Sequence, residues 1–225
     1  MSAIILDTET HTIDGYPIEI SHSPCSFEQG VLEVDHNRNF DQYFSCPEPI
    51  TFGAMAVHHI LEADLVGCPS HDTFRLPADV THIIGHNIDY DIRAIRLCDS
   101  FIQVKAICTL ALSRMVWPDM DSHTLGALYY FIMEDKALAR THLRKAHNAK
   151  WDIYFTGIVL KAIVEKLGIK DMQSLYLFSE QARIPTKITF GKHKGMAIKD
   201  LPSDYVVWLL KQPDLDPYLV KALKG

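Results

Sequence analysis

Ile4-Ile5-Leu6-Asp7-Thr8-Glu9 is the stretch that decides the fold of this chain. Its three apolar residues are typical of a strand that is buried on both faces of a sheet. Residues i and i+2 of a strand point to one face, so Asp7 and Glu9 would lie side by side, with Thr8 on the opposite face. Adjacent carboxylates repel each other unless a cation lies between them, and Mg²⁺ prefers such oxygen ligands. Taken alone, the pair equally fits a polar strand end.

A second acidic motif, Gly85-His86-Asn87-Ile88-Asp89-Tyr90-Asp91, follows an apolar strand over 81–84. Open α/β sheets place their sites at the carboxyl ends of strands. We therefore expect Asp91, in the first turn of a helix over about 89–98, to join the Asp7 and Glu9 pair. Asn87 and Asp89 also fit a simpler role as helix caps, whereas Asp91 lies too deep for one.

The third motif is His147-Asn148-Ala149-Lys150-Trp151-Asp152. Residues five apart on one helix differ by about 140° and cannot share a site. We therefore expect His147 in a loop, and Asp152 on the sheet-facing side of a helix over 150–167. A histidine, with an ordinary pKa of about 6.5, is suited to taking a proton from an attacking water. As one of 12 histidines, His147 taken alone fits a surface residue better than a catalytic one.

The composition is that of an ordinary globular protein, with 225 residues, 48% hydrophobic and 22% charged. No run of about 18 apolar residues indicates a membrane span, and the first residues lack the basic region of a signal peptide. The 5 cysteines are dispersed without a Cys-x-x-Cys pair, so neither a zinc site nor a disulfide framework is expected. These features predict a cytoplasmic protein.

The net charge of −6 is unevenly distributed. Residues 183–225 contain eight Lys/Arg and four Asp, a balance of +4, which leaves −10 for the remainder. An acidic body with a basic tail is compatible with a nuclease whose carboxylates are neutralised by bound cations. Such asymmetry is also common in proteins without this function.

The pattern along the chain predicts a mixed α/β sheet with helices on both faces. Arg183-Ile184-Pro185 interrupts it, which indicates one domain over 1–182 and a small α+β module over 186–225, beginning with a strand over 187–190. Besides the elements above, strands are expected near 16–22, 31–35 and 104–107, and helical segments near 52–66, 108–116, 123–133 and 171–182.

Together, the ordered motifs resemble the DEDD superfamily of 3′→5′ exonucleases over residues 3–167. The family patterns are Asp-x-Glu, His-Asn-x-x-x-Asp and His-x-Ala-x-x-Asp. The sister branch has Tyr at the position of Asn148, so the chain is similar to the histidine branch. The resemblance implies a ribonuclease H-like fold. It also implies two Mg²⁺, or Mn²⁺ in their place, held by Asp7, Glu9, Asp91 and Asp152, with His147 as general base and nucleoside 5′-monophosphates as products.

The resemblance further implies that a set of residues near the first motif contacts the terminal nucleotide. This set consists of Thr8, Thr10, Ile13, Val57 and His58. The chain departs from the family pattern at Thr12, where glycine is usual, and at His59, where glycine is frequent. Ile13 takes the place of a leucine and can supply the same apolar contact.

The tail sequence Phe190-Gly191-Lys192-His193-Lys194-Gly195 resembles a turn in a small module that follows the exonuclease domain in one bacterial branch of the family. We expect Lys192 and Lys194 to bind phosphates, although a solvated hairpin tip fits equally well. The apolar residues that follow have helical spacing and are expected to form the core of the module rather than a base-stacking platform. They are Leu201, Tyr205, Trp208 and Leu209.

This pairing of modules favours DNA 3′ ends, single-stranded or duplex, as the substrate. The catalytic motifs alone leave an RNA or short-oligonucleotide exonuclease as an alternative. A nucleic-acid-binding or polymerase-associated subunit without turnover is the alternative from another class. The sequence does not determine the oligomeric state.

Overall fold

The computed structural model describes residues 2–213 and 215–225. Contacts divide the chain into two compact units, Met1–Ser179 and Glu180–Gly225. The sequence places the end of the first domain at 182, whereas the last turn of α7 (Met172–Ala182) belongs with the second unit by contacts. Glu180 accepts a hydrogen bond of 2.6 Å from the Tyr218 hydroxyl, and the Arg183 guanidinium lies 4.4 Å from the Tyr218 ring centroid.

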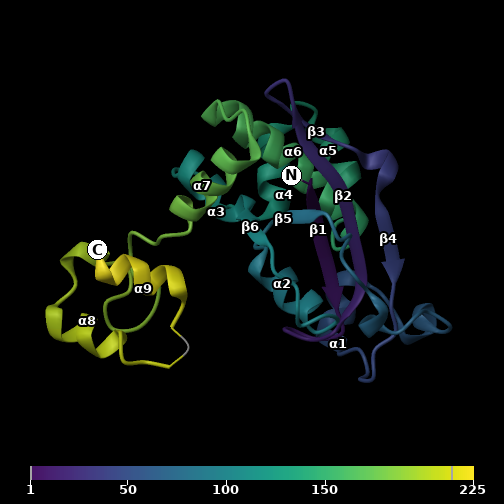
Figure 1. The fold of residues 1–225 in the computed structure, drawn as a ribbon, viewed down its shortest axis with the longest axis horizontal. Helices are drawn as coiled ribbons and strands as arrows, with labels where there is room; N and C mark the ends of the chain where they lie inside the picture. Colours follow the sequence, from purple (N-terminus) through teal and green to yellow (C-terminus); the bar gives the residue numbers. More distant parts are fainter. Residues whose placement is uncertain (1, 214) are drawn as a thin grey trace. The chain divides into compact units, whose positions relative to one another are not determined.

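The first unit is built on a mixed sheet, in the strand order β3-β2-β1-β5-β6, with β4 also paired to β2 (Figure 1). β1 is parallel to β5, and β5 to β6, while the pairs that β2 forms with β1, β3 and β4 are antiparallel. The strands are β1 (Ser2–Thr10), β2 (Pro17–Glu28), β3 (Val31–Val34), β4 (Phe40–Tyr43), β5 (Val80–Gly85) and β6 (Lys105–Cys108).

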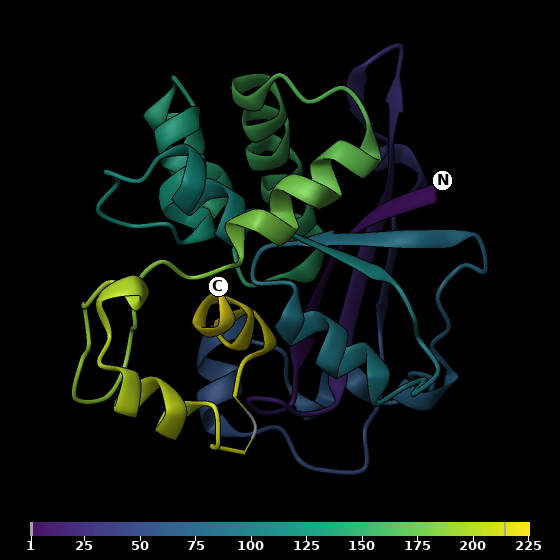
Figure 2. The same cartoon turned by 60° about the vertical axis from the view of Figure 1, so that its left-hand side comes forward.

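Helices cover both faces of this sheet, as the sequence predicts (Figures 1 and 2). The α-helices of the unit, besides α7, are α1 (Phe52–His58), α2 (Asp89–Arg96), α3 (Thr109–Val116), α4 (Leu125–Ile132), α5 (Lys136–Leu143) and α6 (Ala149–Leu167). Short 3-10 turns occur at His36–Arg38, Glu62–Leu65 and His71–Thr73. None of the helices in the described part of the chain has the length and apolar character that crossing a bilayer requires.

Successive side chains of β1 point to opposite faces of the sheet, so its apolar residues pack into two cores. Ile4 and Leu6 pack in a cluster with Ile88, Ile92 and Ile95 from α2 and the turn before it. The opposite face of β1 carries Ile5, which lies against Gly157 of α6. Asp7 and Glu9 continue the face of Ile5, so they point to the side on which α6 packs.

The sequence did not predict β4 or α5. Of the strand expected over 187–190, only one residue forms a β-bridge, so that prediction is wrong for the rest of the segment. In the second unit, Lys187 and Ala197 form an isolated antiparallel bridge. That unit otherwise contains a 3-10 turn at Ile198–Asp200, α8 (Ser203–Leu209) and α9 (Pro217–Lys224). Its core consists of Ile188, Ile198, Leu201, Leu209 and Leu219. Because only Ile188 of the 187–190 segment is buried, that segment has no apolar face to hold a longer strand.

Gly85 provides a test of how tightly β5 packs beside β1. A Cβ at Gly85 would lie 2.6 Å from Ile88 Cδ1 and 3.0 Å from the Leu6 carbonyl oxygen. Because Ile88 is fully buried, Gly85→Ala should lower the free energy of unfolding by about 1–3 kcal/mol, measured by urea denaturation. Gly53→Ala is the matched control, since nothing lies within 4 Å of its added Cβ. The Gly53 variant should be no less stable than the parent, because alanine favours a helix over glycine; equal stability of all three proteins would contradict the packing argument.

Candidate metal and hydrolytic site

The three sequence motifs meet at the carboxyl ends of the parallel strands β1 and β5. Asp7 and Glu9 come from β1, Asp91 from the first turn of α2, and Asp152 from the first turn of α6. His147 lies in the loop before α6, whose N-cap is Asn148. Glu9, His147 and Asp152 each offer a ligand atom, and these atoms lie within 4.8 Å of one another. Asp7 and Asp91 are not members of this tight group, but both interact electrostatically with its carboxylates.

The site is defined by carboxylates that lie close together: Asp91 and Asp152 are buried, and Asp7 and Glu9 are half-buried. Burial is the largest cause that raises the pKa of Glu9 to about 8, followed by repulsion from Asp152 and Glu19. Burial and its carboxylate neighbours raise the pKa of Asp7 well above its ordinary value. Burial likewise raises the pKa values of Asp91 and Asp152, each to about 7. The group therefore resists carrying its full negative charge at neutral pH without a cation.

Asp91 is fixed by a contact that crosses from α2 to β1. Its Oδ1 accepts hydrogen bonds of 2.9 Å from both the backbone N–H and the hydroxyl of Thr8. Thr8 faces away from Asp7 and Glu9 on the strand, as the pattern predicts, and this orientation lets it hold Asp91. These bonds lower the pKa of Asp91 and partly offset the effect of its burial. A carboxylate from a second element is thereby fixed at the end of β1.

Backbone strain marks both loops that carry site residues. Asn87 and His147 have φ of 68° and 62°, in the left-handed region that residues other than glycine seldom adopt. Asn87 does not cap α2, whose N-cap position is Ile88 without a side-chain cap bond. The His147 N–H donates to Asp152 Oδ2 at 3.0 Å, which ties the strained loop to α6. Such conformations persist where the surrounding contacts hold them, and they cluster at functional sites.

Glu19 is a fifth carboxylate at the site, and the sequence motifs do not include it. It lies on β2 directly opposite Glu9 and is 1% exposed. Its Oε1 accepts from the Asn148 side-chain amide at 2.6 Å, and its Oε2 from the Ala149 N–H at 3.1 Å. Burial raises the pKa of Glu19 to about 7, while these two hydrogen bonds lower it. Glu19 therefore joins the start of α6 to the sheet, which only the strand register reveals.

A groove of about 570 Å³ opens beside the carboxylates. Its lining includes Asp7, His147 and Asp152, together with Arg114 and His123. Arg114 is the one Lys or Arg among the described residues that line this groove. Arg114 could not be identified from the sequence, because nothing in its surroundings on α3 forms a motif. The groove thus places a single cation on the same surface as the acidic cluster.

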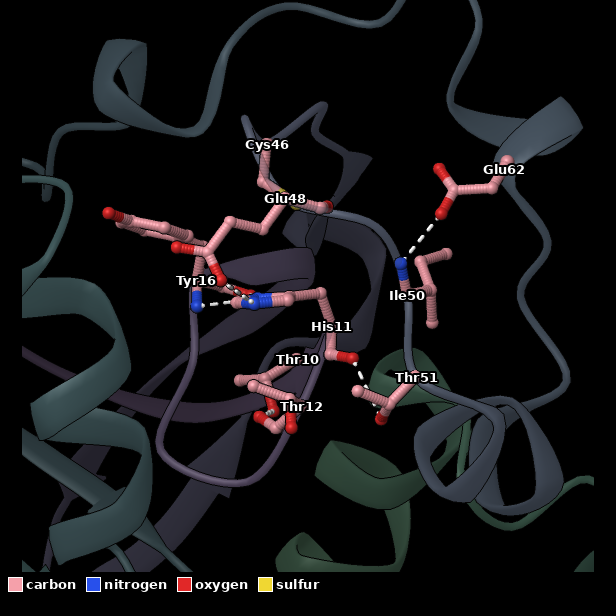
Figure 3. Close-up of polar contacts among 9 residues, drawn as sticks. All are labelled: Thr10, His11, Thr12, Tyr16, Cys46, Glu48, Ile50, Thr51 and Glu62. Atoms are coloured by element: carbon pink, nitrogen blue, oxygen red, sulfur yellow. Dashed lines mark hydrogen bonds and ion pairs between the residues drawn. The ribbon is translucent and has the colours of Figure 1, made fainter.

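The loop after β1 is held by polar contacts, which Figure 3 shows. His11 is buried; its Nδ1 accepts from the Tyr16 N–H at 2.9 Å, and its Nε2 lies 3.3 Å from Glu48 Oε2. The Thr51 N–H donates to the His11 carbonyl oxygen at 2.9 Å. Thr12, which replaces a usual glycine, does not have positive φ; Asp14 takes that conformation, with φ of 57°. The loop therefore accommodates Thr12 without the conformational freedom of glycine.

The residues expected near a terminal nucleotide fall into two groups. Ile13 and Val57 are 84% and 45% exposed, so their side chains are available to a ligand. Thr8, Thr10 and His58 are buried and bonded within the protein: the Thr10 hydroxyl contacts the Thr12 carbonyl oxygen and the Tyr90 hydroxyl, and His58 Nδ1 accepts from the Ile60 N–H.

The second departure from the family pattern, His59, has a clear structural role. His59 is the C-cap of α1 and has φ of 61°. Glycine adopts this left-handed conformation without steric cost, which accounts for its frequency at such a position.

Comparisons with known proteins were made for the sequence and for the fold. Exodeoxyribonuclease 10 of Escherichia coli K12 is 26% identical over 225 residues, covering 98% of this chain and 96% of that protein. The same enzyme from E. coli O6:H1 matches equally well. Residues 181–214 match a family model described as "Putative quorum-sensing-regulated virulence factor".

Solved structures share the fold. Exonuclease X in complex with 5′ overhanging duplex DNA has a TM-score of 0.59 at 24% identity, covering 77% of this chain and 99% of that one. E. coli exonuclease I with a dA16 oligonucleotide has a TM-score of 0.53 at 16% identity, covering 82% of this chain and 44% of that one. These likenesses confirm the ribonuclease H-like arrangement expected for the first unit.

The raised pKa values predict how pH and cations affect stability. In the unfolded chain these carboxyl groups release their protons near pH 4, whereas in the folded protein they keep them until about pH 7–8. The metal-free protein should therefore lose stability as pH rises from about 4 to 8. Mg²⁺ should restore stability at pH 8 and have little effect at pH 5, as measured by urea denaturation in EDTA and with added Mg²⁺. Asp152→Asn should reduce both responses, whereas the exposed Glu134→Gln should retain them. A Mg²⁺ response that survives in Asp152→Asn would count against this site.

The Glu19 contact predicts a compensating pair of substitutions. At pH 8.5 in saturating Mg²⁺, where bound cations would offset the repulsion among the carboxylates, Glu19→Gln should lower the free energy of unfolding by about 1–3 kcal/mol, because an amide N–H₂ would face the Asn148 amide. Adding Asn148→Asp should recover most of the loss, since the introduced glutamine could then donate to the introduced carboxylate and still accept from Ala149. Urea denaturation of both single variants and the double variant measures the coupling. Simple additivity of the two losses would show that the contact does not join β2 to α6.

Proposed function

We propose that this chain is a member of the DEDD superfamily of 3′→5′ exonucleases, and that it hydrolyses DNA from the 3′ end and releases nucleoside 5′-monophosphates. The observation that carries the proposal is the convergence of Asp7, Glu9, Asp91 and Asp152, with His147, at the carboxyl ends of β1 and β5. Likeness to an exodeoxyribonuclease over 98% of the chain supports DNA as the substrate.

The residues of the cluster fit divalent cations. Their donors are carboxylate oxygens and one imidazole, with no thiolate, which suits Mg²⁺ or Mn²⁺ better than Zn²⁺. The raised pKa values of Glu9, Asp91 and Asp152 indicate that full ionisation needs added positive charge. We assign Asp7, Glu9, Asp91 and Asp152 as the ligands of two such ions. When bound, the ions supply the Lewis-acid charge that activates water and stabilises the leaving oxygen.

His147 is suited to the proton transfer. Its side chain is exposed, within 4.8 Å of ligand oxygens of Glu9 and Asp152, and its backbone is fixed by Asp152 Oδ2. A neutral imidazole there takes a proton from the attacking water as the new P–O bond forms. The bond between phosphorus and the 3′ oxygen of the preceding nucleotide then breaks, and that oxygen takes up a proton to become the new 3′ hydroxyl.

The groove gives the substrate a path to this centre. Arg114 lines the same groove as the acidic cluster and offers a planar cation suited to a backbone phosphate. Ile13 and Val57, exposed on the loop after β1 and on α1, supply apolar contacts for the terminal nucleotide. Thr8 and Thr10 then contribute chiefly by holding other parts of the site in place. Thr8 holds Asp91, and Thr10 holds the loop after β1.

Digestion of 5′-labelled single-stranded DNA, duplex DNA and RNA tests this function. Activity should vanish in EDTA and return with Mg²⁺. His147→Ala should reduce turnover by about 10²–10⁴-fold, the usual contribution of a general base, while the Mg²⁺-induced gain in stability remains. Asp152→Asn should lose both turnover and that gain, and His36→Ala, an exposed histidine on the 3-10 turn His36–Arg38, is the matched control. Full activity in chelator or in His147→Ala would rule out the assigned mechanism; a preference for RNA would correct the substrate alone.

A further inference from the structure

The second unit contains a row of aromatic rings, part of which lies outside its buried core. Sequence spacing predicts that Leu201, Tyr205, Trp208 and Leu209 form one core, but the structure divides this set. Leu201 and Leu209 are buried, and Tyr205 packs partly against them. Trp208 is 52% exposed. The expectation that all four residues are core is therefore wrong for Trp208, which lies on the outer side of α8.

The rings contact one another in series, one pair stacked and the other edge-on. The Tyr205 and Trp208 ring centroids are 5.4 Å apart, and their planes differ by 26°. On its other side, Tyr205 contacts the His193 ring at 4.4 Å and 62°. The rings of His193, Tyr205 and Trp208 thus form a continuous series that ends at a half-exposed indole. Because its neighbour supports it, Trp208 can present its ring without losing further side-chain entropy on binding.

A basic turn, which contains His193, packs against these rings. His193 is flanked by Lys192 and Lys194, both exposed, between Gly191 and Gly195 with φ of 67° and 90°. A Cβ at Gly191 would lie 2.9 Å from the Tyr205 hydroxyl, so glycine is needed for the turn to approach the rings. Lys211, also exposed, follows Trp208 by one turn, and its N–H donates to the Trp208 carbonyl oxygen at 3.2 Å. Residues 187–212 contain five lysines and two aspartates, a positive balance.

We propose that His193, Tyr205 and Trp208, with Lys192, Lys194 and Lys211, form a second binding site for single-stranded DNA, separate from the metal cluster. A flat, exposed ring beside several flexible cations matches the two parts of a nucleotide, since the base stacks on Trp208 and the phosphates pair with the lysines. The positive balance of residues 187–212 favours a polyanion as the ligand. The site would retain the strand while the catalytic unit removes nucleotides.

The experiment measures binding by the full chain carrying Asp152→Asn, in EDTA, so that DNA is not degraded. The probes are 5′-labelled oligo(dT) and an abasic oligonucleotide of the same length, followed by fluorescence anisotropy. The parent should prefer oligo(dT). Trp208→Ala should weaken binding of oligo(dT) by about 5- to 150-fold and remove the preference. Trp208→Phe should keep much of it, and Val207→Ala is the matched control, because Val207 is equally exposed on α8 outside the aromatic series.

Substituting the lysines should change DNA binding in a different way from substituting the aromatic residues. Lys192→Ala combined with Lys194→Ala should weaken both probes alike and reduce the logarithmic salt slope by roughly 0.7 for each lost phosphate contact. The proposal would be overturned if Trp208→Ala binds oligo(dT) as tightly as the parent does. It would also be overturned if this variant loses the same affinity for both probes. A change of oligomeric state in Trp208→Ala, without a change of DNA affinity, would assign this surface to contacts between copies of the chain and overturn it as well. Because binding is measured without turnover, these outcomes are independent of whether the metal cluster hydrolyses DNA.

Discussion

Repulsion between buried carboxylates is the constraint on which the rest of the first unit depends. Asp7 and Glu9 lie on one face of β1, and the folded chain adds Asp91, Asp152 and Glu19 around them. A fold that served stability alone would disperse these charges, because each one raises the pKa of its neighbours. Bound cations would neutralise such a cluster, which is why we propose that these carboxylates hold metal ions.

The scaffold supports this cluster by joining elements that would otherwise be independent. Thr8 holds Asp91, which fixes the start of α2 to β1. Glu19 holds Asn148 and Ala149, which fixes the start of α6 to β2. Both contacts are buried, where a hydrogen bond to a charged group is strongest and most costly to lose. The two helices that bring carboxylates to the site are therefore anchored at the ends where those carboxylates lie.

Local pattern predicted most of the fold because periodicity and burial agree in the central elements. The apolar runs of β1 and β5 and the three-to-four spacing of α6 are reproduced by the structure. The pattern failed where tertiary contacts replace it. β4 is a short edge strand that exists by pairing with β2, and α5 is a short helix that packs against α4. The strand expected at 187–190 becomes a single bridge because only Ile188 is buried there.

The sequence by itself determined which groups could meet at the site, since the identities and spacings of Asp7, Glu9, Asp91, His147 and Asp152 restrict which elements carry them and which faces they occupy. Only the tertiary structure decided what surrounds them. Glu19 and Arg114 belong to no motif, and their approach to the site follows from strand register and helix packing. The exposure of Trp208 is likewise a tertiary result, because helical spacing identifies a possible core position without showing what covers it. Local periodicity records which residues share a face; the partner of that face is set by contacts between residues distant in the chain.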